Sequence, residues 1–343
     1  MSKANASEIE ALRPFLEDRV AQLGSIAHIK KFGSGQSNPT YMLETSTGKF
    51  VLRTQPPGKL LKSAHRVDRE FRVMQALAET EVPVPPVLFL ADEDNPLGRM
   101  FYLMGHVEGR IFWDPALPEA HDNDERAAIF DAMNATLAAL HNVNVKAAGL
   151  EDYGRPGDYF ARQYARWSEQ YRATETREIA NMDRLIAWLG ENMPPDDGQS
   201  CLVHGDFRHD NMIFAPKRPA VLALIDWELS TLGHPLADLS YQCMQWRLPH
   251  ASAFKGLGGI DRTRLGLPSE ETYVERYAER RGLSDIPHWN FYLAFAFFRL
   301  AAICQGVYKR ALDGNASNPQ KAEAYGQQVE TMADLAMDLV QSA

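Results

Sequence analysis

One polar cluster between two apolar triplets most constrains the fold of this chain. The stretch CLVHGDFRHDNMIF, residues 201–214, places charged and amide side chains between the triplets CLV and MIF. Apolar triplets are typical of short buried strands and polar clusters of loops, so the pattern predicts a charged loop between two strands. A third apolar run, VLALI, ends just before Asp226. We therefore expect Asp206, Asn211 and Asp226 to meet at one place.

These three side chains are typical of a magnesium site beside a catalytic base. Carboxylate and amide oxygens are hard ligands that suit Mg²⁺ and suit softer metals poorly. Protein-bound Mg²⁺ uses one or two such groups and completes its coordination with water and phosphate oxygens. Asn211 and Asp226 fit that description, which leaves Asp206 to accept a proton from an attacking hydroxyl.

Two other interpretations of the cluster stay open. Asp and Asn favour turns, so each residue alone is explained by turn chemistry. His204, Asp206, His209 and Asp210 together suggest the metal centre of a phosphohydrolase, although no second histidine cluster completes it. That interpretation gives the N-terminal part of the chain no role.

Composition argues against several classes of protein. The chain has 343 residues and a formal net charge of −9, unlike a general nucleic-acid binder. Its three cysteines are far apart in apolar surroundings and are predicted to be buried free thiols. The N-terminus has no hydrophobic signal core, and the apolar stretch 291–308 carries Arg299 in its middle. We therefore expect a buried core helix there, and a cytoplasmic protein that binds neither membrane nor nucleic acid.

The first part of the chain mixes strand and helix patterns. Residues 28–54 are typical of three strands with tight turns, and residues 63–80 of an amphipathic helix. The runs VPVPPVLFLAD and MFYLMG predict two further strands. Residues 1–105 are therefore predicted to form a small sheet with one helix packed on it, and Gly105 and Gly109 to let the chain turn at the boundary.

Helical patterns dominate residues 106–343. Only residues 201–226 are predicted to interrupt them with strands. The predicted helices cover about residues 124–143, 157–173, 179–192, 234–247, 270–281, 288–310 and 320–341. The chain is thus predicted to be an α+β protein in two parts.

The motifs together resemble one known family. H-x-D-x-x-x-x-N followed by an aspartate at the end of a β-ribbon is the catalytic layout of protein kinases. HGDFRHDN with IDWE resembles the version found in the aminoglycoside phosphotransferase family. FGSGQSN, FVLRTQPPG, DREFRVM and FYLMGHVEG are similar to that family's nucleotide loop, third strand, following helix and hinge, so the resemblance covers nearly the whole chain.

The resemblance implies a fold and an activity. The fold is the two-lobed protein-kinase-like fold, with a small antiparallel sheet and a mainly helical lobe. The activity is transfer of the γ-phosphoryl group of ATP, with Mg²⁺, to a hydroxyl of a small molecule; GTP as the donor stays open. VLRTQPPGKLLKSAHRVDREFRVMQAL is more similar still to a branch whose domain is also found fused to acyl-CoA dehydrogenases.

The resemblance also implies roles for single residues. Asp206 is the catalytic base, and Asn211 and Asp226 hold Mg²⁺. Arg208 stands where protein kinases have a lysine that contacts the transferred phosphoryl group, and Asp238 binds the backbone of the catalytic loop. The nucleotide-binding residues are Gly33, Ser34, Gly35, Arg53, Glu70, Met104, Gly105 and Val107.

The sequence departs from the family pattern in places. The third strand carries Arg53 where a lysine is usual, and arginine still binds phosphates through two parallel hydrogen bonds. Asn38 replaces the last glycine of the nucleotide loop. The segment between Asp226 and Asp238 is too short for the activation segment of a protein kinase, so a protein substrate is not expected.

The charge of one segment bears on the acceptor. Residues 245–310 contain ten basic and six acidic side chains inside an acidic chain. A positive wall favours an anionic ligand, so a hydroxy acid or its CoA thioester is the expected acceptor, with Arg247 and Arg299 as candidate contacts. A kinase for aminoglycosides or choline is one alternative. A nucleotide-binding pseudokinase without turnover is another, although the intact set of Asp206, Asn211 and Asp226 argues against it.

Overall fold

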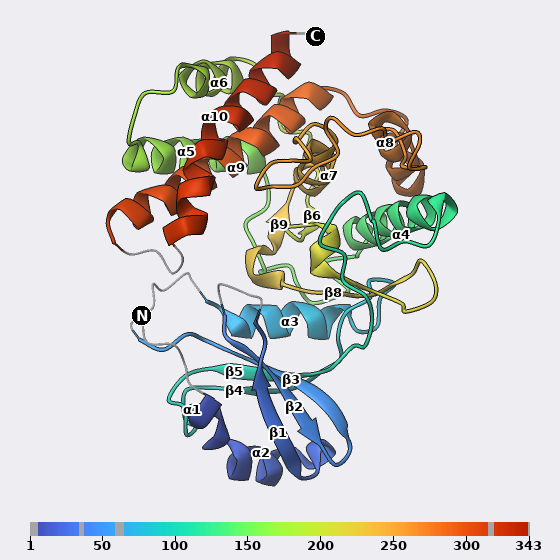
Figure 1. The fold of residues 1–343 in the computed structure, drawn as a ribbon, viewed down its shortest axis with the longest axis vertical. Helices are drawn as coiled ribbons and strands as arrows, with labels where there is room; N and C mark the ends of the chain where they lie inside the picture. The colour runs from blue at the N-terminus through green and yellow to red at the C-terminus, as the bar shows by residue number, and fades with distance from the viewer. Residues whose placement is uncertain (1–5, 34–37, 59–64, 315–318, 342–343) are drawn as a thin grey trace.

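The sheet of the N-terminal part follows the predicted order of three strands, a helix and two strands. The computed structural model describes residues 6–33, 38–58, 65–314 and 319–341. Five antiparallel strands pair in the order β1-β2-β3-β5-β4. Their bounds are β1 Ile26–Lys31, β2 Thr40–Thr45, β3 Gly48–Thr54, β4 Val87–Ala91 and β5 Phe101–Gly105, with α3 at Val67–Leu77 (Figure 1).

Both faces of this sheet are covered by helices. Helix α3 packs on one face, where it meets Tyr102. On the other face α1 (Ala6–Glu10) and α2 (Arg13–Arg19) bury Ile9 and Leu16 in one apolar cluster with Tyr41 and Leu43 (Figure 1). The prediction of a single packed helix was therefore wrong. The two short helices carry few apolar residues among charged ones, so their periodicity is weak.

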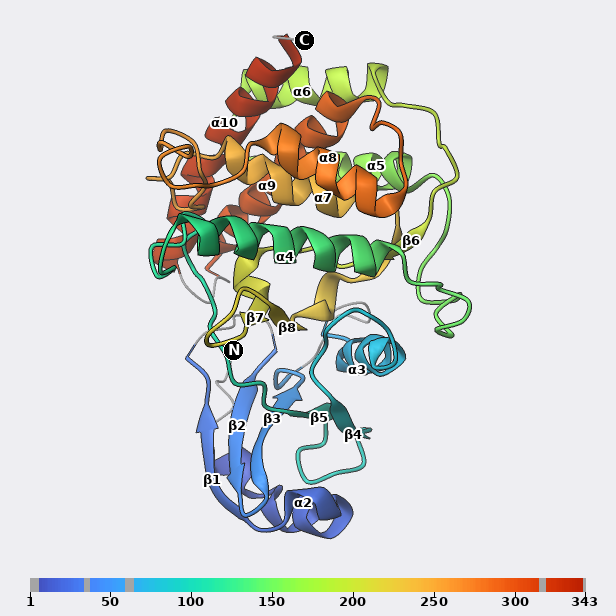
Figure 2. The same cartoon turned by 90° about the vertical axis from the view of Figure 1, so that its right-hand side faces the viewer.

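The second part is built mainly from helices, as predicted. The helices are α4 Asn123–His141, α5 Tyr159–Thr174, α6 Ala180–Glu191, α7 Leu236–Cys243, α8 Glu270–Arg281, α9 Trp289–Leu312 and α10 Pro319–Gln341 (Figures 1 and 2). The predicted 234–247 helix continues beyond Cys243 as a 3-10 turn, Met244–Trp246. By length and composition α9 alone among the described helices is apolar enough to cross a membrane, and 78% of its most apolar window is buried inside the protein. The three cysteines are buried and free.

Two short ribbons interrupt the helices. Strand β6 (Cys201–Val203) pairs with β9 (Thr231–Gly233), and β7 (Met212–Phe214) pairs with β8 (Val221–Leu224). Strand β9 was not predicted, because three residues that end in glycine carry no strand pattern. These pairings bring the polar loop after β6 close to the end of β8, and they thereby assemble the cluster with which the sequence analysis began.

The connection between the two parts depends on close backbone approach. Arg110 exchanges backbone hydrogen bonds of 2.8 Å with Phe214 of β7. A Cβ on Gly109 would lie 2.3 Å from the Phe214 carbonyl oxygen, and one on Gly105 would lie 2.8 Å from Cγ of Pro86. Neither glycine has a positive φ. They are needed because neighbouring groups come close, and not because the chain turns there, as the sequence had suggested.

Candidate active site

A buried aspartate holds the polar loop that follows β6. Asp238 of α7 accepts the backbone N–H groups of His204 at 2.6 Å and Gly205 at 2.8 Å. Its carboxylate also lies 3.3 Å from Nε2 of His141. Burial opposes the charged form, but His141 and the contacts to His204 hold the pKa of Asp238 below its usual range. The loop is therefore anchored through its backbone to a buried carboxylate in the core.

His204 joins this loop to the end of β8. Its Nδ1 accepts the backbone N–H of Asp206 at 3.2 Å, so its Nε2 carries the proton and donates to the Ile225 carbonyl at 3.0 Å. The Ile225 N–H in turn donates to the Asn211 carbonyl at 2.9 Å. Both ring nitrogens of His204 are thus occupied. The phosphohydrolase alternative needs His204 as a metal ligand, and neither ring nitrogen of His204 is free to bind a metal ion.

Asn211 fixes the predicted base. Its Nδ2 donates to the backbone oxygen of Asp206 at 2.9 Å and to Oδ2 of the same residue at 2.9 Å. The amide nitrogen is therefore used inside the loop, and Oδ1 of Asn211 stays available as a ligand. The backbone hydrogen bond from Ile225 to Asn211 brings this loop next to the residue that precedes Asp226.

Asp226 lies at the end of β8 in a left-handed conformation. Its φ is +66°, a region that Asp and Asn tolerate better than most residues. Oδ1 accepts from Nη2 of Arg53 at 2.7 Å, and the side chain is 36% exposed. A carboxylate and an amide oxygen suit Mg²⁺ when phosphate and water complete the shell. Within the described ranges no group of three or more His, Cys, Asp or Glu side chains is arranged to hold a metal ion.

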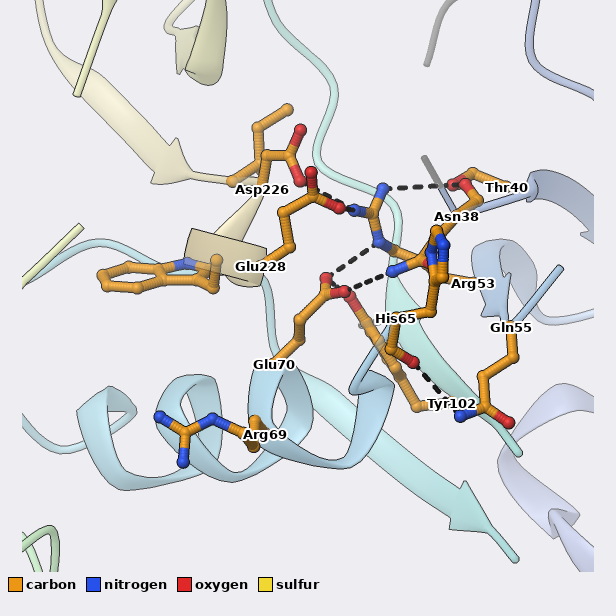
Figure 3. A network of polar contacts seen from close by, with 12 residues as sticks. Asn38, Thr40, Arg53, Gln55, His65, Arg69, Glu70, Tyr102, Asp226 and Glu228 are labelled. Carbon is orange, nitrogen blue, oxygen red and sulfur yellow. Dashed lines mark hydrogen bonds and ion pairs between the residues drawn. The ribbon is translucent and has the colours of Figure 1, made fainter. Parts of the chain in front are cut away.

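Arg53 connects the sheet to the helical part (Figure 3). Its Nε lies 2.8 Å from Oε2 of Glu70 in α3, and its Nη2 lies 2.7 Å from Asp226 and 3.5 Å from Glu228. The Arg53 side chain is 11% exposed and that of Glu70 only 1%. Burial opposes the charged form, but the carboxylates of Glu70 and Asp226 raise the pKa of Arg53. Arg53 and Glu70, both predicted nucleotide-binding residues, form an ion pair, and the network extends to the predicted metal ligand Asp226.

Other residues around Glu70 were not identified as site residues from the sequence. Asn38 donates from Nδ2 to Oε1 of Glu70 at 2.8 Å, and Tyr102 donates from its hydroxyl to Oε2 at 3.1 Å (Figure 3). Nδ1 of His65 lies 2.9 Å from Oδ1 of Asn38. In the sequence, Asn38 is a departure from the glycine pattern of the nucleotide loop, yet in the structure it is buried and orients Glu70. Its position at the end of that loop was the only sequence feature that could have identified it as a site residue.

The remaining nucleotide-binding predictions lie around this network. Gly33 is exposed at the end of the first described segment, and Ser34 and Gly35 lie outside the described residues. Met104 and Gly105 are the last residues of β5, and the Gly105 N–H is used by the Pro86 carbonyl at 2.8 Å. No described residue forms a hydrogen bond with the backbone of Val107. The carbonyl of Gly105 and the backbone of Val107 are the groups left for a ligand.

The predicted basic residues near the acceptor are paired within the protein. Arg208 forms a two-pronged ion pair with Asp210, with Nε 2.9 Å from Oδ1. Arg247 pairs with Glu270. Arg299 donates from Nη2 to the Gly205 carbonyl at 2.7 Å. Arg247 and Arg299 thus already have partners inside the protein, and the expectation that they contact an anionic acceptor stays a prediction.

Comparisons with known proteins agree on one family. Residues 28–282 match the phosphotransferase enzyme family. Mouse acyl-CoA dehydrogenase family member 10 is 48% identical over 309 residues, which are 90% of this chain and 29% of that protein. The chain thus spans less than a third of that relative.

Two solved structures extend the comparison. A protein of Ralstonia eutropha JMP134 named for the aminoglycoside phosphotransferases is 42% identical, with a TM-score of 0.88 and 98% of each chain covered. Aminoglycoside phosphotransferase APH(4)-Ia, solved with AMP-PNP and hygromycin B, is 15% identical with a TM-score of 0.60, over 95% of this chain and 98% of that chain. That second likeness shows the two-lobed kinase-like fold.

Proposed function

The chain belongs to the phosphotransferase enzyme family, whose members transfer phosphoryl groups to hydroxyls, and on that premise we propose that it phosphorylates a small-molecule alcohol with ATP and Mg²⁺. The observation that carries the proposal is the meeting of Arg53 and Asp226. Asp226 follows Ile225, which is hydrogen-bonded to Asn211 of the base-bearing loop, and it meets the buried cation that the sheet supplies. That is the arrangement that positions a nucleotide phosphate against an acceptor hydroxyl.

The loop that carries Asp206 and Asn211 would form no covalent bond with the substrate and would act by binding, positioning and proton transfer. Bound Mg²⁺ would neutralise charge on the phosphates, and Asn211 and Asp226 would hold it. Asp206 would accept the hydroxyl proton through the carboxylate oxygen that Asn211 leaves free. Arg53 would turn from Asp226 to the phosphates, since a guanidinium binds two oxygens at once. Met104, Gly105 and Val107 would place the adenine. Most of the rate enhancement would come from positioning and charge stabilisation.

For the acceptor we propose a hydroxy acid or its CoA thioester. The support is the set of relatives named as acyl-CoA dehydrogenase family members. The net positive charge of residues 245–310 supports an anionic acceptor less than the sequence suggested. Arg247 forms an ion pair with Glu270, and Arg299 is hydrogen-bonded to the Gly205 carbonyl. An aminoglycoside is the second candidate, since the Ralstonia protein is named for that group.

The test is a screen for acceptor-stimulated ADP release. Hydroxy acids, hydroxyacyl-CoA compounds, aminoglycosides and choline are assayed at one MgATP concentration, with Asp206→Asn as the control protein. The proposal expects turnover of an anionic alcohol by the wild-type chain and not by the variant. Turnover of a polycation with no turnover of any anionic alcohol would overturn the acceptor assignment. No MgATP binding at all would overturn the phosphotransferase assignment.

A further inference from the structure

Arg299 is a charged residue in the middle of the apolar helix α9. Its neighbours Phe298 and Leu300 are buried. A charge in such a place is costly unless it is hydrogen-bonded. Its Nη2 donates to the Gly205 carbonyl at 2.7 Å. Gly205 directly precedes the proposed base, so this partly buried guanidinium makes its hydrogen bond to the loop that carries Asp206.

Two aromatic rings direct the guanidinium. Its carbon lies 5.4 Å from the ring centre of Tyr241 in α7 and 6.0 Å from that of Trp167 in α5. Both distances are in the range of cation–π contacts. Tyr241 and Trp167 are themselves buried in the core. Three helices thus place one donor against one carbonyl oxygen.

The peptide group between Gly205 and Asp206 is held at both ends. Arg299 binds its carbonyl oxygen, and Nδ1 of His204 accepts its N–H at 3.2 Å. Gly205 itself has φ +84°, and a Cβ there would lie 2.6 Å from the Leu229 carbonyl oxygen. Its own N–H is bound by Asp238 at 2.8 Å. The backbone that leads into Asp206 has almost no freedom to rotate, and this backbone sets the direction of the Asp206 side chain.

Tyr241 links the same arginine to the base. Burial, followed by the nearby charge of Asp206, raises the pKa of Tyr241, so the phenol stays protonated. Arg299 lies over the Tyr241 ring, and it also binds the peptide group that carries Asp206.

We propose that Arg299 is a positioning residue for the phosphotransfer reaction, acting through the Gly205–Asp206 peptide and the Tyr241 ring. The inference rests on the proposed role of Asp206 as the base. It predicts that losing the guanidinium misplaces the Asp206 carboxylate while leaving the nucleotide contacts of Arg53 intact.

The test is a double-mutant cycle with Arg299→Met and Asp206→Asn. Methionine keeps much of the aliphatic volume and removes every N–H donor. In the wild-type background Arg299→Met is expected to lower kcat by about 10–100-fold, the scale of small misplacements of a catalytic group. The KM for MgATP is expected to change less than about twofold. In the Asp206→Asn background, Arg299→Met is expected to cause almost no additional loss of kcat, because Arg299 and Asp206 act in one chain of contacts.

Two variants keep the result interpretable. Arg299→Lys keeps the charge and one donor, and it is expected to recover part of kcat even if Arg299→Met folds poorly. Arg280→Met removes another partly buried arginine, which contacts Asp131 and Asn134 in the helical part, and it is expected to leave kcat unchanged.

Each outcome bears on one assignment. Wild-type kcat in folded Arg299→Met, a kcat of Arg299→Lys no higher than that of Arg299→Met, or a loss that multiplies fully in the Asp206→Asn background overturns the positioning role. Full activity of Asp206→Asn removes the base assignment on which this inference rests. Absence of both MgATP binding and phosphotransfer in the wild-type chain overturns the proposed function, whatever Arg299 does.

Discussion

The proposed nucleotide site around Arg53 and the proposed catalytic loop after β6 are held by different kinds of contact. Around Arg53 the contacts are ion pairs and hydrogen bonds between side chains, and they join two parts of the molecule. In the catalytic loop they are hydrogen bonds from side chains to backbone, and Asp238 anchors them in the core. Side-chain ion pairs can exchange partners when a phosphate arrives, whereas a loop bound through its backbone keeps its shape. The region around Arg53 is therefore expected to be adaptable, and the loop anchored by Asp238 is expected to be rigid.

The largest expected effect comes from removing the base from the rigid region. Asp206→Asn preserves the size of the side chain and can keep an acceptor oxygen for Asn211. It is expected to lower kcat by about 10²–10⁴-fold, the usual range for losing a general base, with MgATP binding retained. Initial rates and calorimetric titration measure the two quantities. If Asp206→Asn had the kcat of the wild-type chain, Asp206 would not be the general base.

The anchor of the loop is expected to matter for stability and to depend on pH. Asp238→Asn replaces one acceptor oxygen with an amide group that faces a backbone N–H, and it should lower the free energy of unfolding by roughly 2–4 kcal/mol. The pKa of Asp238 is depressed in the folded chain. Its stabilisation is therefore present above the unfolded-state pKa of about 4 and lost as the pH falls through the folded value.

Urea denaturation of both proteins between neutral and acidic pH measures this difference. The gap in unfolding free energy between the wild-type chain and Asp238→Asn should narrow as the pH falls. A gap that is the same at every pH would show that the Asp238 charge does not anchor the loop.

A smaller effect is expected from the adaptable region. Arg53→Met removes the cation that Glu70 and Asp226 share, and it should weaken MgATP binding by about tenfold, the equivalent of one charge-assisted hydrogen bond. The kcat at saturating MgATP should change less than the affinity. Steady-state kinetics over a range of ATP concentrations separates the two, and a pure loss of kcat would mean that Arg53 belongs functionally with the loop.

The smallest expected effect tests a residue that orients Glu70. Asn38→Ala removes the hydrogen bond from Nδ2 to Glu70 and should cost about 1 kcal/mol in MgATP affinity. Thr40→Ala, which removes a hydroxyl 3.4 Å from Nη1 of Arg53, is the matched control and should have a weaker effect. Equal effects of the two changes would show that Asn38 has no special part in holding Glu70.

The two regions also differed in how far the sequence predicted them. Local patterns predicted the order of strands and helix along the N-terminal part, the helices from α4 to α10 and the meeting of Asn211 with Asp206, because the residues involved lie close together in the chain. The contact from Arg53 to Asp226 joins distant segments and was not predicted. Charge counting did not reveal the partner of Arg299, because composition does not show that a partly buried guanidinium binds the backbone of a loop.

The central claim is that the junction of the two regions is a magnesium–nucleotide site. Calorimetric titration of ATP with and without Mg²⁺, into the wild-type chain and Asp226→Ala, tests it most directly. The wild-type chain should bind ATP more tightly with Mg²⁺ than without it. Asp226→Ala should lose that difference while it keeps most of the affinity measured without the metal. Equal losses with and without Mg²⁺, or a wild-type affinity that is indifferent to Mg²⁺, would contradict the account.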